Sequence, residues 1–224
     1  MAKSFEVAGE FFKYQKDLVS RVQGIIRAYR NKEPLNMLDY MFMLDLLERH
    51  PDADQKIGAG VDYMCINENP EYPGERNRGF YLVRVDGTST DFSYRECIKP
   101  TPHRKKVLNA MRAKVEGDTL AFKNAAFDGK STLVCPDTGK PIAFTTSHVD
   151  HVAPLTFPVL VDGFLSAVGM TFDDIELRPS GDNQFRDEFA DESLAEEWRK
   201  YHADNAQLEV VSAWANLSIR RRAA

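Results

Sequence analysis

Hydrophobic positions in the first hundred residues change from a helical period to an alternating one. Apolar residues on one stripe predict an amphipathic helix over residues 10–30, and a second helix over 37–49 ends before Pro51. The stripe of the first helix consists of Leu18, Val22, Ile25, Ile26 and Tyr29. Alternating or β-branched runs predict strands over residues 57–67, 80–85 and 90–94. This order predicts a small antiparallel sheet with helices, an α+β unit over residues 1–100.

The second half of the chain shows the same mixture of periods. Lys99-Pro100-Thr101-Pro102 is typical of a junction, so we expect a second domain over residues 101–224. Its expected elements are a basic helix over residues 103–125, a hairpin over 131–152, helices over 157–168 and 191–204, a strand over 208–212 and a final helix over 213–222. An acidic, irregular segment is expected over residues 171–190.

The composition of the chain is that of a folded globular protein, with 43% apolar and 28% charged residues. No apolar run reaches the roughly 20 residues that span a bilayer, so we expect no membrane partner. The N-terminus lacks the apolar segment of a signal peptide. The three cysteines form no C-x-x-C motif, which favours a reducing, cytoplasmic setting without disulfides.

Charge is unevenly distributed along the chain, although the net charge is only −5. Residues 99–130 carry eight Lys or Arg and three acids, whereas residues 171–197 carry ten acids and two Arg. Such a pattern fits a protein that meets phosphate on one face. Solvated helix faces would give the same runs, and the charge pattern alone does not separate these alternatives.

The segment His148 to Pro154, taken with Asn216, contains residue types suited to phosphodiester cleavage. A neutral imidazole can make water nucleophilic, and carboxylate and amide oxygens suit a hard cation such as Mg²⁺. Asp150 and His151 are adjacent, so on an extended chain they point to opposite sides. A strand that ends or bends before Pro154 would let both serve one site.

Two segments of the second half resemble HNH endonucleases. The first runs from Cys135-Pro136-Asp137-Thr138-Gly139 through His148-Val149-Asp150-His151 to Phe157, and the second from Trp198 to Arg221. The resemblance implies a zinc-free ββα-metal domain that hydrolyses DNA, or RNA, with one Mg²⁺ or Mn²⁺. By the same resemblance His151 is the general base and Asp150 and Asn216 are the metal ligands. Gln207 takes the place of the family's middle Asn, which orients the base loop.

The chain departs from the HNH pattern at the zinc cysteines. Many members carry two C-x-x-C pairs, but here only Cys135 is present, and Ser212 and Ala215 stand where the second pair would lie. A tetrahedral zinc site cannot be built from one thiolate, so we expect no structural zinc.

Further polar residues are predicted to contact substrate, each with a structural alternative. The candidates are His148, His202, Arg220, Arg221 and Arg95. His148 could instead make a structural hydrogen bond, and His202 could pack beside Trp198. The terminal arginines could clamp phosphate or belong to a frayed tail. The pair Asp150-His151, if isolated, would be typical of a surface turn.

A second resemblance lies in the first half. Four segments look like the DCL (defective chloroplasts and leaves) domain: Gln55-Lys56-Ile57-Gly58-Ala59-Gly60-Val61, Arg78-Gly79-Phe80, Arg84-Val85-Asp86-Gly87 and Asp91-Phe92-Ser93-Tyr94-Arg95-Glu96-Cys97-Ile98. A similar domain ends the largest subunit of a plant RNA polymerase. The resemblance implies a module that binds or targets nucleic acid. Its candidate phosphate contacts are Arg78, Arg84 and Arg95.

Together these patterns predict a metal-dependent HNH endonuclease acting on DNA, guided by a DCL-like module. The alternative is a non-catalytic protein on an HNH-like scaffold that binds nucleic acid, RNA included. We expect a cytoplasmic protein of bacterial or phage origin. A homodimer is expected if both DNA strands are cut, because one HNH centre cuts one strand at a time.

Overall fold

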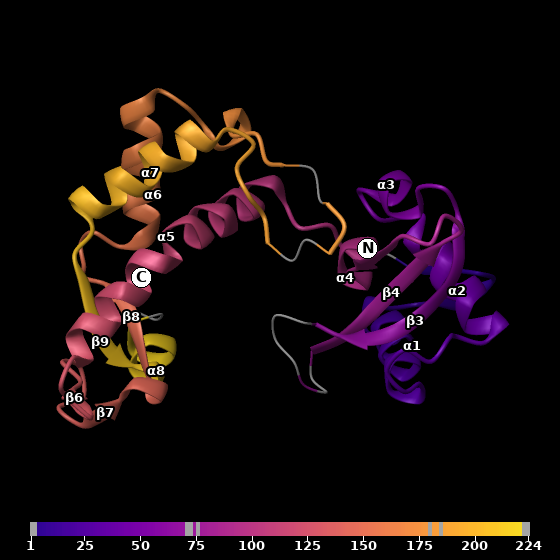
Figure 1. Ribbon diagram of the computed structural model, residues 1–224, viewed down its shortest axis with the longest axis horizontal. Coiled ribbons are helices and arrows are strands. Elements are labelled where there is room, and N and C mark those ends of the chain that lie inside the picture. The colour runs from indigo at the N-terminus through magenta and orange to yellow at the C-terminus, as the bar shows by residue number, and fades with distance from the viewer. Residues whose placement is uncertain (1–3, 70–73, 75–76, 179–180, 184–185, 221–224) are drawn as a thin grey trace. The chain divides into compact units, whose positions relative to one another are not determined.

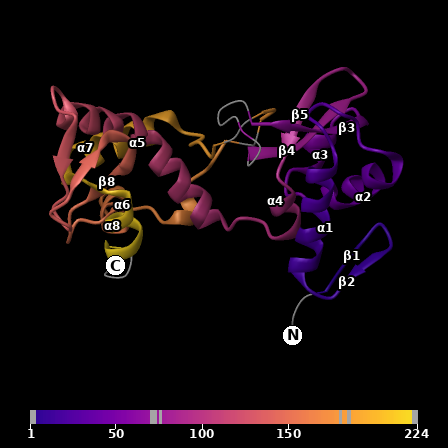
Figure 2. The same ribbon diagram turned by 90° about the horizontal axis from the view of Figure 1, so that it is seen from below.

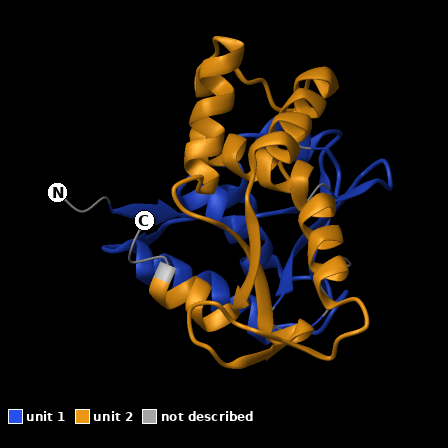
Figure 3. Ribbon diagram, turned by 90° about the vertical axis from the view of Figure 1, so that its left-hand side faces the viewer, with its two compact units in different colours: residues 1–102, 179–185 blue, residues 103–178, 186–224 orange. Residues whose placement is uncertain are grey.

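The computed structural model describes residues 4–69, 74, 77–178, 181–183 and 186–220. The chain divides into two compact units (Figure 3). Unit 1 comprises Met1–Pro102 and Pro179–Phe185, and unit 2 comprises His103–Arg178 and Arg186–Ala224. The predicted division at residue 100 did not assign residues 179–185 to the first unit.

Unit 1 combines four helices and five strands in the part of the chain that is described (Figures 1 and 2). In chain order they are β1 Phe5–Val7, β2 Glu10–Phe12, α1 Gln15–Ala28, α2 Met37–Leu47, α3 Ala53–Ile57, β3 Val61–Glu68, β4 Arg78–Arg84, β5 Ser89–Phe92 and α4 Tyr94–Ile98. Strands β3, β4 and β5 form an antiparallel sheet in that order, and β1 pairs with β2. The predicted mixed α/β architecture with small antiparallel sheets is confirmed.

The hairpin β1–β2 replaces the start of the predicted first helix, which begins at Gln15 rather than residue 10. Ala8 and Gly9 both have positive φ, 47° and 79°, and form a two-residue turn between paired Val7 and Glu10. Such turns usually carry Asn-Gly or Asp-Gly, so Ala-Gly gives little signal in the sequence.

The core of unit 1 lies between the helices and the sheet. Leu18, Val22 and Ile25 of α1 are buried, which confirms the predicted apolar stripe. On the sheet, the rings of Phe80 and Phe92 stack with centroids 5.6 Å apart. Burial of these apolar faces holds the helices on the sheet.

Gly58 follows α3 in a conformation that an L side chain rarely adopts, with φ 53° and ψ −121°. A Cβ there would lie 2.9 Å from Arg84 Nε. We therefore expect Gly58→Ala to lower the free energy of unfolding by about 1–3 kcal/mol. Gly24→Ala, inside α1 with open space around it, should instead raise this free energy by roughly 0.5–1 kcal/mol. Urea unfolding of both variants checks the opposite signs.

Unit 2 is built on the long helix α5, His103–Phe127 (Figure 1). Its other elements are β6 Thr132–Val134, β7 Pro141–Ala143, β8 Ser147–His151, α6 Phe157–Val168, α7 Glu192–Asn205, β9 Leu208–Ser212, α8 Ala213–Ala215 and the π-helical turn Asn216–Arg220. Short 3-10 turns lie at Phe144–Thr146 and Phe172–Asp174. Among the described helices of both units, none combines the length and apolar character that a bilayer crossing requires.

The hairpin predicted over residues 131–152 is wrong in part, because it does not include strand β8. Only β6 and β7 pair there, and β8 pairs antiparallel with β9 instead. Helices α6 and α7 lie between these two strands in sequence, and α8 with its π-helical turn follows β9 directly. The result is a strand, an insertion, a partner strand and a helix.

Candidate active site

Strand β8 distributes the predicted site residues over its two faces. Asp150 pairs with Glu209 and His151 with Leu208, so the strand is extended through its last residue. Side chains alternate along such a strand. His148 and Asp150 therefore share one face, and His151 belongs to the other.

The face of His148 also receives Asn216 from the π-helical turn. The Asn216 side-chain amide nitrogen lies 3.3 Å from His148 Nδ1, although the two residues are 68 apart in sequence. Ser212 helps to set this position, because its hydroxyl accepts a hydrogen bond from the Ala215 amide and caps α8. The structure thus places Asn216 beside His148 of the predicted first segment, and it supports the hydrogen-bonding alternative for His148.

A shallow cavity of about 500 Å³ opens beside this pair. It is lined by Glu116, Gly117, Thr119, Leu120, Lys123, Ser147, His148, Val149 and Asn216. Lys123 Nζ donates to the Ser147 carbonyl at 2.6 Å and lies 4.3 Å from the Phe144 ring centroid. Burial lowers the pKa of Lys123. The sequence analysis did not single out this lysine, because it treated Lys123 only as one of the charges of a basic helix.

His151 lies at the end of β8, half-buried against the core of unit 2. Its Nε2 lies 2.9 Å from His202 Nε2, and its ring meets Phe157 edge-on at 5.5 Å. Burial, then the neighbouring His202 and Arg112, lower the pKa of His151 to about 4. His151 is therefore neutral at neutral pH, and a pKa this far below neutrality makes it a weaker base than an ordinary imidazole.

His202 lies in the core, with 1% of its surface exposed. It packs beside Trp198, with ring centroids 5.5 Å apart, and reaches His151 through its Nε2. A side chain so enclosed contacts no substrate from solvent, so the predicted substrate-binding role is replaced by that of a partner to His151. The packing beside Trp198 that the sequence left open is present.

Acid should weaken unit 2 through these two imidazoles. Burial is the first cause that lowers the pKa of both His151 and His202 from 6.5 in the folded state. The unfolded chain therefore binds more protons below about pH 6.5, and stability that is fully present above it is lost as the pH falls toward about 4. In urea unfolding at about pH 7 and 5, we expect this loss in the wild type and a smaller one in His202→Gln. Equal losses would contradict the prediction.

Gln207 supports the base loop through its main chain. Its carbonyl oxygen accepts a 2.8 Å hydrogen bond from the amide of Val152, the residue after His151. The Gln207 side chain is exposed. This geometry replaces the predicted side-chain role and explains why a longer amide is compatible with the site.

We expect Gln207→Ala to keep the activity proposed below within about threefold of wild type, since the main-chain bond survives. Gln207→Pro removes no carbonyl but restricts the backbone, and it should reduce activity more. Initial cleavage rates of the two variants check this order.

Cys135 joins the β6–β7 turn to β9, because the Ser212 amide donates to its sulfur at 3.3 Å. Burial raises the pKa of this thiol, but hydrogen bonds from Thr138 and Ser212 outweigh it and lower the pKa to about 7. Within the described ranges, no group of three or more His, Cys, Asp or Glu could hold a metal ion.

The arginines predicted to bind phosphate in unit 1 differ in availability. Arg84 is buried and pairs with Asp182, so it is not a free phosphate contact, in contrast to the prediction. Arg78 donates to Asn31 at 2.8 Å. Arg95 is exposed, with its guanidinium 5.6 Å from the Tyr94 ring centroid. In unit 2, Arg221 and the Arg220 side chain lie outside the described residues.

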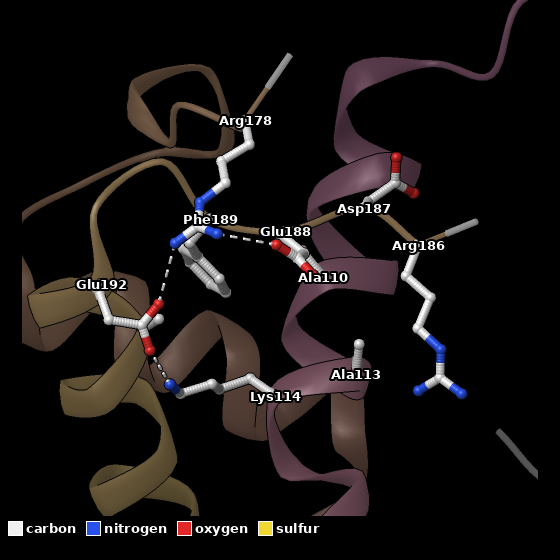
Figure 4. Close-up of a pocket in the computed structure, with 10 residues that line it drawn as sticks. Ala110, Ala113, Lys114, Arg178, Arg186, Asp187, Glu188, Phe189 and Glu192 are labelled. Carbon is white, nitrogen blue, oxygen red and sulfur yellow. Dashed lines mark hydrogen bonds and ion pairs between the residues drawn. The ribbon is translucent and has the colours of Figure 1, made fainter. Parts of the chain in front are cut away.

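Another hollow in unit 2, of about 410 Å³, is lined largely by paired charges (Figure 4). Arg178 pairs with Glu188 at 3.1 Å and Glu192 at 3.5 Å, and Glu192 also meets Lys114. These groups neutralise one another at the surface, so the arrangement indicates a structural ionic network rather than a reactive centre.

Comparison with known proteins places a known domain in unit 1. Residues 23–98 match the family described as "Protein of unknown function (DUF3223)". The relatives below include DCL proteins, so the predicted DCL-like resemblance of the N-terminal half is confirmed.

Three relatives illustrate the match. The chloroplastic DCL homolog of Arabidopsis thaliana is 35% identical over 96 residues, 42% of this chain and 43% of that protein. Subunit 1 of DNA-directed RNA polymerase V from the same plant is 30% identical over 98 residues, 39% of this chain and 5% of that subunit. The solution structure of an uncharacterized Rhodospirillum rubrum protein is 30% identical, with 43% of this chain and 89% of that one covered and a TM-score of 0.39.

The chain spans less than half the length of the curated plant relatives that it matches. Two of them are named as chloroplastic proteins. These matches overturn the expectation of a cytoplasmic protein of bacterial or phage origin. The cytoplasmic setting was inferred from cysteine usage and the N-terminal pattern, and the bacterial or phage origin from the HNH resemblance, none of which reports the organism.

Proposed function

We propose that unit 2 is a metal-dependent phosphodiester hydrolase of the HNH type that cuts DNA. We further propose that the DCL-like domain of unit 1 contacts nucleic acid, with the exposed Arg95 as one phosphate contact. Similarity to a subunit named for RNA polymerase supports nucleic-acid association for this domain. RNA is the alternative substrate.

One observation carries the proposal for unit 2. The contact between Asn216 and His148 brings the two separated motif segments onto the face of β8 that also carries Asp150. Asp150 and Asn216 would hold one Mg²⁺ or Mn²⁺, since a carboxylate and an amide oxygen are donors that these hard ions accept. When bound, such an ion supplies positive charge beside the scissile phosphate.

His151 is the proposed base. It is the last residue of β8. A phosphate at the end of this strand can therefore contact both His151 and a cation on the Asp150 face. If its Nε2–H donates to His202, the His151 Nδ1 is the unprotonated nitrogen and can take a proton from water. The hydroxide so formed attacks phosphorus, and the bond from phosphorus to the leaving oxygen breaks.

His202 then acts as a positioning residue. Its ring is fixed in the core by Trp198, and its nitrogen fixes the orientation of His151. Such partners commonly set which nitrogen of a catalytic histidine is free. Asp150 helps to fix the main chain at His151, because its Oδ1 accepts a 2.9 Å hydrogen bond from the His151 main-chain amide.

Cleavage assays on supercoiled plasmid, single-stranded DNA and RNA test the proposal. With Mg²⁺ or Mn²⁺ we expect cleavage by the wild type, and with chelator none. Asp150→Asn and Asn216→Ala should be strongly impaired, whereas Asp173→Asn, an exposed acid of unit 2, should cleave normally. Cleavage that persists in chelator would contradict the metal, and binding without cleavage of any substrate would favour the non-catalytic alternative.

A further inference from the structure

Unit 1 contains a buried cationic pocket that its DCL-like domain builds by itself. Arg84 and Lys56 are 6% and 3% exposed. Carbonyl oxygens of Lys56 and Gln55 accept from Arg84 at 2.9 and 3.1 Å, and the Thr88 hydroxyl accepts at 3.0 Å. Gly58 leaves the space that the Arg84 side chain fills. Three hydrogen bonds from within the domain thus hold the guanidinium in addition to its pair with Asp182.

The segment Gly181–Asn183 occupies this pocket. Asp182 accepts two hydrogen bonds from Arg84, at 2.7 and 2.9 Å, in the bidentate geometry typical of a strong Arg–carboxylate pair. The Gly181 carbonyl lies 3.4 Å from Lys56 Nζ. Asn183 adds two contacts to β5, from its amide to the Thr90 hydroxyl and from its side chain to the Ser89 carbonyl.

The pocket and its occupant come from different parts of the chain. Arg84 and Lys56 lie within residues 23–98, the span of the matched domain. Asp182 lies 98 residues beyond Arg84, outside that span. A DCL-like domain without this segment would leave a desolvated guanidinium unpaired, which is costly unless an anion is bound.

We propose that this pocket is a binding site for an acidic peptide and that Gly181–Asn183 is its built-in ligand. Asn183, with φ 56°, holds the segment in a turn against Ser89 and Thr90 of β5, the edge strand of the sheet in Figure 2, so the pocket suits a peptide that presents its acidic residue from a turn. Asp182 offers Arg84 one carboxylate, which accepts both hydrogen bonds of the guanidinium fork, so the pocket matches a single acidic side chain.

The test uses the full chain and a fluorescent peptide with the sequence of residues 177–187. In the wild type the tethered segment competes at an effective concentration on the order of millimolar, so the peptide should bind poorly. Asp182→Ala removes the carboxylate that competes for Arg84, and we expect the peptide to bind at least about tenfold tighter. A peptide with Asn in place of the aspartate at 182 should lose this gain.

Two further variants fix the site. Arg84→Lys in the Asp182→Ala background should abolish the gain, because a lysine cannot reproduce the bidentate fork. Asp187→Ala, which removes an acid outside the pocket, should bind the peptide as the wild type does. Equal peptide affinity for wild type and Asp182→Ala, with both folded by circular dichroism, would overturn the proposal. An oligonucleotide that binds Asp182→Ala through Arg84 while the peptide does not would also overturn it.

Discussion

Replacing His151 by alanine should lower the rate of phosphodiester cleavage by about 10²–10⁴-fold, the usual contribution of a positioned general base. The reason lies in the geometry at the end of β8. The imidazole is kept neutral by burial, with a pKa of about 4, and is oriented by His202 at 2.9 Å. Single-turnover cleavage at saturating Mg²⁺ measures the loss directly.

The matched control for this variant is His103→Ala, which removes an exposed histidine of the same unit whose Nε2 lies 3.1 Å from the Phe172 carbonyl. It should cleave like the wild type. His202→Gln should give an intermediate rate, because the ring of His151 remains but loses its fixed partner. Equal rates for wild type and His151→Ala would remove the base assignment.

Trp198→Ala should lower the free energy of unfolding of unit 2 by about 3–5 kcal/mol, the cost of truncating a large core residue. Trp198 is fully buried, at 0% exposure, and its Nε1 donates to the Met111 carbonyl at 2.8 Å. Its ring also packs against Phe157, Phe164 and His202. The substitution removes this packing and the hydrogen bond that Trp198 donates to the Met111 carbonyl.

The chain offers a control in its other tryptophan. Trp214 is 63% exposed, and Trp214→Ala should change the free energy of unfolding by at most about 0.5 kcal/mol. Denaturant unfolding followed by circular dichroism compares the two variants. A loss for Trp198→Ala no larger than for Trp214→Ala would contradict the described core.

The strongest local patterns predicted their elements well. Helix α6 and strand β9 begin and end at the predicted residues, because each is a short apolar run with clear limits. Helix α3 was missed, since five residues give too little period to detect. The pairing of β8 with β9 was also missed, because local sequence does not encode which distant strand completes a sheet.

The candidate site shows the same difference between local patterns and long-range contacts. Residue types suggested Asp150, His151 and Asn216, and the structure brings Asn216 to His148 on the Asp150 face. The contact of His151 with His202 depends on how α7 packs, which no motif records. The occupation of Arg84 by Asp182 likewise depends on a long-range return of the chain.

The central claim is a single divalent cation held at β8 and the π-helical turn. Mn²⁺ binding, measured by electron paramagnetic resonance in the presence of a non-cleavable phosphorothioate oligonucleotide, tests it most directly. We predict one bound ion per wild-type chain, retained in Asp173→Asn and lost in Asp150→Asn and Asn216→Ala. Binding of no ion by the wild type, or undiminished binding by Asp150→Asn, would contradict the claim.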